Sequence, residues 1–470
     1  MSGEPAAHTS GADEPYAIRK MREAGQSEDA IRSFASALRR VSEGVATMLP
    51  SSELEPVTGV PALDELPDVD PGQALAEVVV IKLNGGLATS MGLQEPKSLV
   101  EARDGRSFLE IIVGQTLALR RNHGVRLPLV LMNSEATREA TLQALNRFGE
   151  LPVEGIPLDF EQSMVPKLEA DTLEPVSWPR EPSLEWCPPG HGDVYGALRG
   201  SGMLQTLLDC GFRHAMISNA DNLGAAVDAR IAAHVAREQI PFLMEVVQGT
   251  EADRKGGHIA RRRSDGQLVL RETAQTPKED EESFRDYRRW RYYNTNSLWI
   301  DLHALEARLG DGAGLELPVI VNRKTVDPRD PDSTPVLQLE SAMGAAIGSF
   351  PDARLLLVPR TRFVPVKTTD DLLVLRSDVY ALGEAFDVTP VAGLNGRLPF
   401  VELDKRYYKL IDQFDHRFPG GSPSLRKAER LVVHGDVTFG ADVVVRGRVE
   451  LDVHEPTRIE AGAVLGGEDG

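Results

Sequence analysis

The stretch of residues 78–97, VVVIKLNGGLATSMGLQEPK, limits the fold most, because an apolar run leads directly into a glycine-bearing loop. An apolar run bounded by turn residues predicts a buried strand, here residues 78–81. Gly85 and Gly86 lack side chains, so a phosphate or a flat base can approach the backbone closely there. Lys97 adds a mobile positive charge. The loop has neither the P-loop nor the GxGxxG spacing, and a tight strand–turn–helix with a solvated lysine is the alternative to a nucleotide site.

Strand and helix patterns alternate from residue 78 onward, as in parallel α/β domains. We expect further strands at 127–132, 212–218, 241–247 and 297–300, helices at 108–121, 137–148 and 194–208, and a hairpin within 256–275. In open α/β sheets, ligands bind at the carboxyl ends of the strands. Asn133, Asn219 and Asp221 follow two of the expected strands. We therefore expect the glycine loop to share a site with these polar residues.

The N-terminal 70 residues predict a tail, a helix and a linker. Residues 1–14 are small, polar and acidic, which is typical of disorder. Residues 15–49 carry an apolar stripe that predicts one helix packed on the main body, formed by Ile31, Phe34, Leu38, Val41, Val45 and Met48. A coiled coil is disfavoured because the run is short. Residues 50–71 are rich in Pro, Asp and Glu and predict a linker across the surface.

The pattern changes near the C-terminus. In residues 431–451, apolar side chains recur every six positions, at Val437, Val443 and Val449 and in parallel at Phe439, Val445 and Leu451. This period, with turn glycines between the runs, predicts the coils of a parallel β-helix, and an antiparallel meander is the alternative. We expect three parts: residues 1–70, the main α/β domain at 71–388, and a linker with the β-helix at 389–470.

Composition narrows the class of protein. The 470 residues carry a formal net charge of −19, which disfavours a nucleic-acid or anionic-membrane partner. No apolar run is long enough to span a bilayer, and the start of the chain does not resemble a signal peptide. Only two cysteines occur, Cys187 and Cys210, which argues against a disulfide scaffold or a cysteine zinc site. The cytoplasm is the expected compartment.

Two loops carry candidate ligand-binding side chains. In residues 188–193, PPGHGD, glycines flank His191 before an expected helix start, where anions bind well. A Pro-Gly turn with a surface histidine explains the same residues. In residues 218–222, SNADN, Asp221 offers a hard oxygen suited to Mg²⁺, and Asn219 and Asn222 could hydrogen-bond sugar hydroxyls. An Asx-turn is the alternative there.

Two further segments are candidates for ligand contacts. Residues 294–296, NTN, precede an expected strand and are either turn formers or sugar-binding amides. Arg360, Arg362 and Lys367 form a basic run in an acidic protein, and we expect them to line a phosphate pocket rather than only to pair with nearby acids. The sequence has no GxSxG, HExxH or obvious Ser-His-Asp order, which disfavours a covalent hydrolase.

Taken together, these motifs resemble the eukaryotic-type UTP–glucose-1-phosphate uridylyltransferase family. The resembling segments are KLNGGLATSMG with PKS, PLVLMNS, PPGHGDVY, SNADNLGA, KGGH, NTNSLWI, LQLESAMGAAI and VPRTRFVPVKTTDDLL, in the family's order over residues 78–451. The resemblance implies an α/β fold: a glycosyltransferase-A-like nucleotidyltransferase domain with a mixed, mostly parallel sheet, a C-terminal left-handed parallel β-helix and an N-terminal helical segment. It also implies Mg²⁺-assisted formation of UDP-glucose and pyrophosphate from UTP and glucose 1-phosphate.

The resemblance also assigns roles to individual residues. Lys97 and Lys367 would be catalytic, and Asp221 would hold the metal. The nucleotide would contact Leu83, Asn84, Gly85, Gly86, Gln162 and Gly190, and the sugar phosphate would contact His191, Asn219 and Asn296. Lys324 matches a basic family position more loosely.

The chain departs from the family pattern at three positions. Ala88 and Glu95 stand where glycine is common, and Ser297 replaces a frequent asparagine. These changes bear on rate and nucleotide choice more than on the fold. The alternatives are a uridylyltransferase for another hexose 1-phosphate, such as N-acetylglucosamine or galactose, and a non-catalytic UDP-sugar-binding protein. A homo-oligomer formed through the β-helix is a further expectation.

Overall fold

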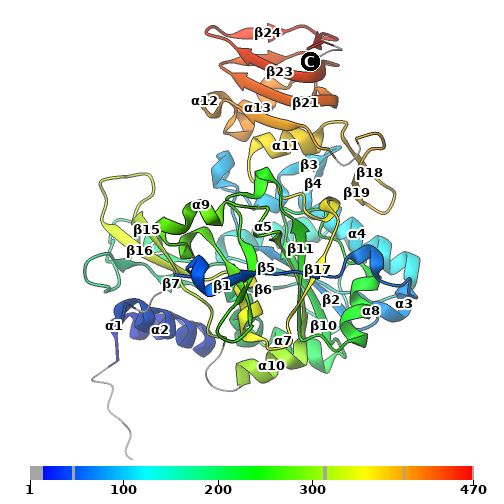
Figure 1. Cartoon of the computed structure of the whole chain (residues 1–470). Helices are drawn as coiled ribbons and strands as arrows, with labels where there is room; N and C mark the ends of the chain where they lie inside the picture. The colour runs from blue at the N-terminus through cyan, green and yellow to red at the C-terminus, as the bar shows by residue number, and fades with distance from the viewer. Residues whose placement is uncertain (1–13, 45–47, 311–314, 395–396, 468–470) are drawn as a thin grey trace, which may run out of the picture.

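The computed structural model describes residues 14–44, 48–310, 315–394 and 397–467. A large mixed sheet covered by helices forms the body, and a stack of C-terminal strands stands on one end of it (Figure 1). Within the described residues, no helix combines the length and hydropathy needed to cross a membrane. The expected mixed α/β class is confirmed.

The central sheet has ten strands. Its main path runs through β1 (Leu54–Pro56), β12 (His258–Arg262), β14 (Tyr292–Asp301), β10 (His214–Asn219), β2 (Val78–Asn84), β5 (Leu129–Asn133) and β6 (Asp159–Glu161). Three more strands branch from this path, namely β11 (Phe242–Gln248), β13 (Leu268–Arg271) and β17 (Arg354–Leu357). The expected strands and the hairpin of β12 and β13 are present.

The order of the parallel strands creates a site at β2. The chain passes from β2 through α4 (Phe108–His123) to β5 and through α5 (Glu135–Leu145) to β6, then returns to β10 on the other side of β2. Asn84 lies opposite Asn133, and Leu83 lies opposite Asn219, so the three strands end together. Such a reversal of direction opens a crevice at the carboxyl ends of the strands.

Local sequence explains both the helices and the strands of this unit. The first turn of α4 has a capping box, in which Ser107 Oγ accepts the Glu110 N–H and the Glu110 carboxylate accepts the Ser107 N–H. Gly124 ends α4 with φ of +66°. Along β2, Val78 and Val80 pack into one hydrophobic core, whereas Val79 and Ile81 pack into the other. The strand is therefore buried on both faces, which explains its unbroken apolar sequence.

The N-terminal prediction was wrong in detail. The expected single helix is two helices, α1 (Tyr16–Glu23) and α2 (Glu28–Ser42). Gly25 adopts φ of +72°, and Ser27 caps α2 by accepting the Ala30 N–H, so the chain turns between them. The apolar stripe is shorter than expected, because α2 ends before Met48, which is exposed, and Val45 lies outside the described residues.

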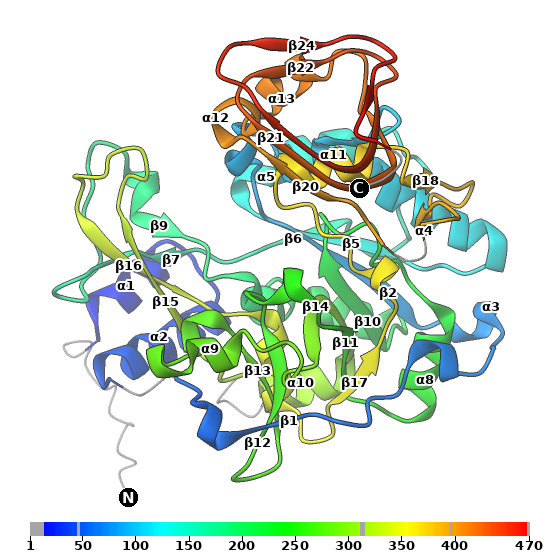
Figure 2. The same ribbon diagram turned by 45° about the horizontal axis from the view of Figure 1, so that its top comes forward.

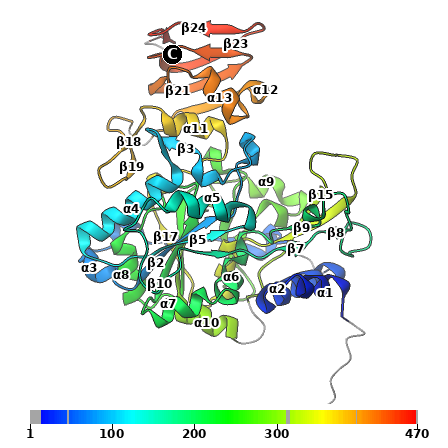
Figure 3. The same cartoon turned by 180° about the vertical axis from the view of Figure 1, so that it is seen from behind.

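Two further expectations need correction. The expected linker at 50–71 contributes β1, which pairs antiparallel with β12 in the central sheet. The expected helix at 194–208 is α6 (Val194–Gly200) followed by α7 (Met203–Asp209), because Gly202 takes φ of +79° between them. Figure 3 shows α1 and α2 against the flank of the body, on the side of α6 and far from the C-terminal strands.

The C-terminal strands pair in parallel. One sheet contains β20 (Phe400–Leu403), β21 (Ser424–His434), β23 (Val444–Asp452) and β25 (Val464–Leu465), and a second contains β22 (Val437–Phe439) and β24 (Thr457–Ile459). Leu431 lies opposite Val449, which agrees with the six-residue period. The strands wind around a shared interior (Figure 2), where Phe439 is fully buried. Parallel pairing rules out the antiparallel meander.

Replacing Phe439 by alanine should destabilise this C-terminal stack. The ring is fully buried and stacks on Phe418 at 5.0 Å between centroids. Loss of a buried phenyl ring costs about 3–5 kcal/mol, which urea unfolding followed by fluorescence and circular dichroism can measure. The control is Val464→Ala, because Val464 is 51% exposed and should change stability by less than ~0.5 kcal/mol. Equal effects of the two substitutions would contradict the packing described above.

Candidate active site

A cavity of about 260 Å³ opens at the carboxyl ends of β2 and β10. The family resemblance gave specific roles to twelve residues, and all of them line this cavity except Lys367 and Asn296, namely Leu83, Asn84, Gly85, Gly86, Lys97, Gln162, Gly190, His191, Asn219 and Asp221. The cavity lies where the strand order reverses, as expected for an open α/β sheet. Residues far apart in the sequence thus meet at one end of the sheet.

The glycine loop folds back on itself and returns Lys97 to the cavity. The Lys97 N–H donates to Gly86 O at 3.1 Å, and the Ala88 N–H donates to Glu95 O at 3.0 Å. Ala88 is buried with φ of −81°, so its methyl group causes no backbone strain. Glu95 is exposed and does not line the cavity. Neither departure from the family pattern therefore distorts or fills the cavity.

Gly85 and Gln162 are in close contact across the cavity wall. A β-carbon at position 85 would lie 2.5 Å from Gln162 Oε1, so no larger residue fits without moving this side chain. The Gly85 carbonyl accepts the Ser134 hydroxyl at 2.9 Å, which fixes the loop on β5. Asn84 donates its amide to Asn133 Oδ1 at 2.8 Å and to Thr141 Oγ1 at 2.9 Å. That amide nitrogen therefore serves the protein scaffold.

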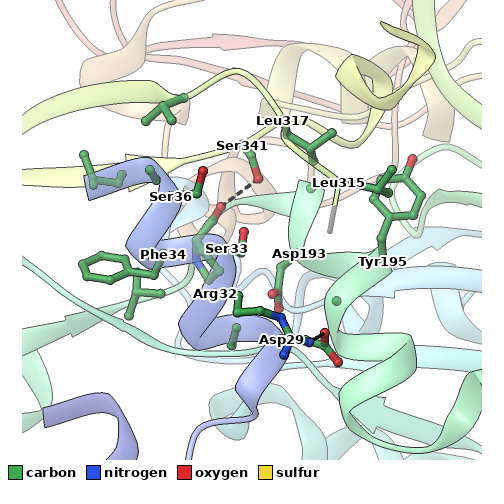
Figure 4. A pocket seen from close by; sticks show the side chains of 18 of the residues that line it. Asp29, Arg32, Ser33, Phe34, Ser36, Asp193, Tyr195, Leu315, Leu317 and Ser341 are labelled. Carbon is green, nitrogen blue, oxygen red and sulfur yellow. Dashed lines mark hydrogen bonds and ion pairs between the residues drawn. The ribbon is translucent and has the colours of Figure 1, made fainter. Parts of the chain in front are cut away.

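Asp193 joins the loop after β6 to the loop before α6, both of which border the cavity. Its Oδ2 accepts the Ser163 N–H at 2.6 Å, next to Gln162. Burial raises the pKa of Asp193 to about 6, although the Ser163 N–H opposes the rise. Figure 4 shows Asp193 at a small cavity of about 70 Å³ between α2 and the loop before α6, close to Asp29 and Ser341. Sequence reasoning noted Asp193 only as part of a helix start and missed this link.

His191 is held as a neutral hydrogen-bond donor. Its Nδ1 accepts the Met343 N–H at 2.9 Å, which leaves the ring proton on Nε2. Burial, with a contribution from Lys367, lowers the pKa of His191 to about 4. The preceding Gly190 has φ of +80°, and a β-carbon there would lie 2.5 Å from Ser341 O. The glycine is therefore required for the turn that brings His191 to the cavity.

The strongest charge cluster of the cavity is centred on Asp221. Its Oδ2 accepts hydrogen bonds from Lys97 Nζ at 2.8 Å and from Lys367 Nζ at 3.0 Å. Burial alone would raise the pKa of Asp221, but Lys367 and Lys97 hold it below its ordinary value. Asp221 Oδ1 is buried and has no hydrogen-bond partner among the described residues. The cluster joins the glycine loop to the segment before α11 (Thr369–Arg376).

An orphaned carboxylate oxygen fits a hard cation such as Mg²⁺. The described residues contain no cluster of three or more His, Cys, Asp or Glu side chains arranged around a common point. Mg²⁺ is often held by one or two carboxylates together with substrate phosphates. Asp221 thus matches a metal site that is completed by a phosphate ligand.

Asn296 lies in a bulge of β14. Ser297 of β14 lies opposite Ser218 of β10, but the pairing of β14 with β11 shifts between Glu245 and Val246, where Thr295 and Asn296 are inserted. Asn296 has φ of +55° and exchanges two hydrogen bonds with Asn294. Bulges commonly redirect a side chain beside an active site. Because the pairing of β10 with β14 ends at Ser218 and Ser297, Asn296 and Asn219 both lie just beyond its last pair, at the same end of the sheet.

Other candidates have structural partners instead. Asn222 is buried and bridges the Arg362 carbonyl and the Val364 N–H, so its side chain does not face a sugar. The expected phosphate contact is wrong for Arg362, which pairs with the fully buried Glu245. Arg360 pairs with Asp253 and does not line this cavity, but it lines another pocket together with Lys367. Lys367 is the member of that basic run that reaches the cavity's charge cluster.

Lys324 lies away from the cavity. It is exposed on β15 (Ile320–Thr325), which forms a separate sheet with β16 (Pro335–Glu340) and β8 (Leu168–Glu169). This sheet is at the side of the body near α1 and α2 (Figure 1). The loose match of Lys324 to a family position has no support from its location.

Comparisons with known proteins agree with this geometry. A family model described as UTP–glucose-1-phosphate uridylyltransferase matches residues 32–446. The chain is 37% identical over 463 residues to the UTP–glucose-1-phosphate uridylyltransferase of Hordeum vulgare, covering 96% of this chain and 95% of that one. It is 37% identical over 426 residues to the enzyme of the same name from Solanum tuberosum, covering 90% and 85%.

Solved structures show the same similarity in three dimensions. A mutant of UDP-glucose pyrophosphorylase from Leishmania major in complex with UDP-glucose superposes with a TM-score of 0.90 at 43% identity, covering 96% of this chain and 97% of that one. UDP-glucose phosphorylase from Trypanosoma brucei superposes with a TM-score of 0.88 at 42% identity, covering 96% and 97%.

The substitution Asp193→Asn should stabilise the protein at neutral pH. Because the folded-state pKa is raised to about 6 from 3.8, the native state binds more protons between about pH 4 and 6, and stability falls as pH rises through this window. Asparagine keeps an acceptor for the Ser163 N–H without the buried charge, so the free energy of unfolding should rise by on the order of 1–3 kcal/mol at pH 7.

Urea unfolding at pH 4 and pH 7 measures this effect. The gain should nearly vanish at pH 4, where Asp193 is protonated in the folded protein. Asp171→Asn is the matched control, since Asp171 is exposed and should change stability by less than ~0.5 kcal/mol at either pH. A stability gain that is independent of pH would show that Asp193 does not carry a buried charge.

Proposed function

The chain belongs to the UTP–glucose-1-phosphate uridylyltransferase family, and we propose that its cavity forms UDP-glucose and pyrophosphate from UTP and glucose 1-phosphate, reversibly. The observation that carries this proposal is the Lys97–Asp221–Lys367 cluster at the carboxyl ends of β2 and β10. The two ammonium groups are suited to neutralise a triphosphate, and the free carboxylate oxygen is suited to bind the cation that accompanies it.

The reaction needs no protein nucleophile. A phosphate oxygen of glucose 1-phosphate attacks the α-phosphorus of UTP, a new P–O bond forms, and pyrophosphate leaves from the opposite side. The rate then depends on positioning and on neutralising the charge that builds up on the phosphates. Lys97 and Lys367 supply that positive charge, and both already converge on one atom of Asp221.

The remaining cavity residues fit recognition of the two substrates. Gly85 offers a bare backbone to the uridine, and the adjacent Gln162 amide is suited to hydrogen-bond the uracil edge. Neutral His191 can donate from Nε2 to the sugar phosphate without adding a charge. We propose the other contacts as well: Leu83, Asn84, Gly86 and Gly190 toward the nucleotide, and Asn219 and Asn296 toward the sugar. All of these residues except Asn296 line the cavity, which supports the proposal.

Mg²⁺ is the metal we propose for Asp221. The orphaned, buried Oδ1 supports this assignment, and substrate phosphates would complete the coordination. When bound, the metal would neutralise phosphate charge. Lys97 and Lys367 would then move from the shared carboxylate oxygen toward the phosphates, because Asp221 can satisfy fewer cations once it holds a metal.

The finer architectural assignments are part of the same proposal. We assign residues 71–388 to a glycosyltransferase-A-like catalytic domain, residues 389–470 to a linker with a left-handed parallel β-helix, and residues 1–70 to an N-terminal helical segment. The parallel register of β21 and β23 supports the β-helix. Oligomerisation through the C-terminal stack is favoured by β25, which is an edge strand of its sheet within the described residues. The two free cysteines favour the cytoplasm.

A substrate panel tests the reaction directly. We expect pyrophosphate release from UTP with glucose 1-phosphate, and its loss when Mg²⁺ is removed by a chelator. The panel should include ATP, GTP, N-acetylglucosamine 1-phosphate and galactose 1-phosphate. Turnover that prefers another hexose 1-phosphate would change the sugar but keep the reaction, whereas UDP-glucose binding without any turnover would mean a non-catalytic binding protein.

Lys97→Ala and Lys367→Ala should each lower kcat/KM for UTP by a factor of about 10²–10³, because each removes one preorganised charge. Thermal unfolding should change little, since both lysines lie at the cavity rather than in the core. The control is Lys324→Ala, which removes an exposed lysine from the separate β15 sheet and should leave the kinetics unchanged. Wild-type kinetics in both cavity variants would refute their assignment.

A further inference from the structure

Lys82 is a buried cation behind the cavity that the proposed reaction does not use. It lies on β2, two residues before Asn84, and is 2% exposed. Its Nζ donates to Ser218 Oγ and to the Ala225 carbonyl, both at 2.7 Å. A lysine is almost never fully buried without an ionic partner, and neither of these partners carries a charge.

The charges around Lys82 leave its ammonium without a matching carboxylate. Glu245 is fully buried, but both of its oxygens accept hydrogen bonds from Arg362, at 2.7 and 2.8 Å. Asp221 also attracts Lys82, but it is already shared by the two cavity lysines. Both carboxylates that act on Lys82 are thus already paired with other cations, and neither is left to balance its ammonium.

This imbalance has an electrostatic consequence. Burial and, to a smaller extent, Arg362 lower the pKa of Lys82 to about 7, although Glu245 and Asp221 oppose the shift. Near neutral pH the ligand-free protein therefore contains both charged and neutral forms of Lys82. An anion that enters the cavity favours the charged form.

Lys82 also holds the loop that carries Asp221. Ser218 precedes this loop on β10 and Ala225 follows it, so the Lys82 ammonium joins both ends. The same loop is tied to the Lys367 segment, because Arg362 donates to the Ala226 carbonyl and Asn222 accepts the Val364 N–H. The charge state of Lys82 thus acts on both parts of the Asp221 cluster.

We propose that Lys82 is a positioning residue for the uridylyl transfer, which takes up a proton when phosphates occupy the cavity and then holds the Asp221 loop as a charged anchor behind them. The proposal rests on the proposed function, because the phosphates are those of the UDP-sugar or UTP. The ammonium does not touch the substrate and acts through Ser218, Ala225 and the field at the cavity.

Calorimetry with UDP-glucose tests this proton uptake. UDP-glucose has no group that titrates between pH 6 and 8.5, so protons taken up on binding belong to the protein. Full-length protein is titrated with UDP-glucose at pH 7.5 in HEPES and in Tris, whose ionisation enthalpies differ. We expect wild-type protein to take up roughly half a proton or more, because a group with a pKa of about 7 is mostly neutral at this pH.

Two matched variants separate Lys82 from other buried lysines. Lys82→Met should lose most of the uptake and bind UDP-glucose about tenfold more weakly. Lys167→Met is the control, because Lys167 is also buried and bonded only to a carbonyl, Val326 O at 2.9 Å, but lies outside the cavity. It should bind and take up protons like the wild type.

The outcomes distinguish this inference from the proposed function. Equal proton uptake by wild-type protein and Lys82→Met overturns the role of Lys82, while binding itself still supports the function. Absence of UDP-glucose binding in wild-type protein overturns the function, and the inference falls with it. If Lys82→Met does not fold, the wild-type uptake measured from pH 6 to 8.5 decides, because it should rise through about pH 7. A flat profile overturns the inference.

Discussion

The convergence of Lys97 and Lys367 on one oxygen of Asp221 is the contact on which the cavity depends. It links three distant parts of the chain: the glycine loop after β2, the end of β10 and the segment before α11. Without a ligand, the three groups partly neutralise one another in a partly buried place. Binding a triphosphate is then an exchange of ionic partners, so affinity reflects a difference between two sets of contacts rather than a sum of new ones.

The sheet makes this convergence possible. Because β10, β2 and β5 are parallel and in register, their last residues lie together at one edge of the sheet, and no long loop is needed to bring them there. Asn296 comes from β14, which runs antiparallel to β10. It lies in a bulge of that strand and adopts a positive φ angle. Beneath the edge, the Glu245–Arg362 pair and Lys82 fix the loops from behind. The loops that carry Lys97, Asp221 and Lys367 are thus anchored on the end of the sheet by buried contacts.

Much of this arrangement could be predicted from the sequence. Local sequence patterns predict local structure well. Such patterns correctly indicated the buried strand at residues 78–81, the helix α4 and the parallel strands near the C-terminus. The family resemblance identified ten of the fourteen residues that line the cavity. The helix predictions that failed depended on the backbone conformation of single residues. Gly25 and Gly202 adopt positive φ angles and interrupt helices whose apolar pattern continues past them. The sequence also does not show which distant residues pair with each other. Arg362 was predicted to bind phosphate, but its partner in the structure is Glu245.

The contact between Gly85 and Gln162 has a consequence for changing this protein's nucleotide preference. A β-carbon at position 85 would meet the terminal amide of Gln162, so a larger residue there displaces that side chain. Because Gln162 is the residue that we assign to the uracil edge, a substitution at Gly85 acts on base recognition through Gln162. Positions 85 and 162 are therefore coupled in setting the nucleotide preference.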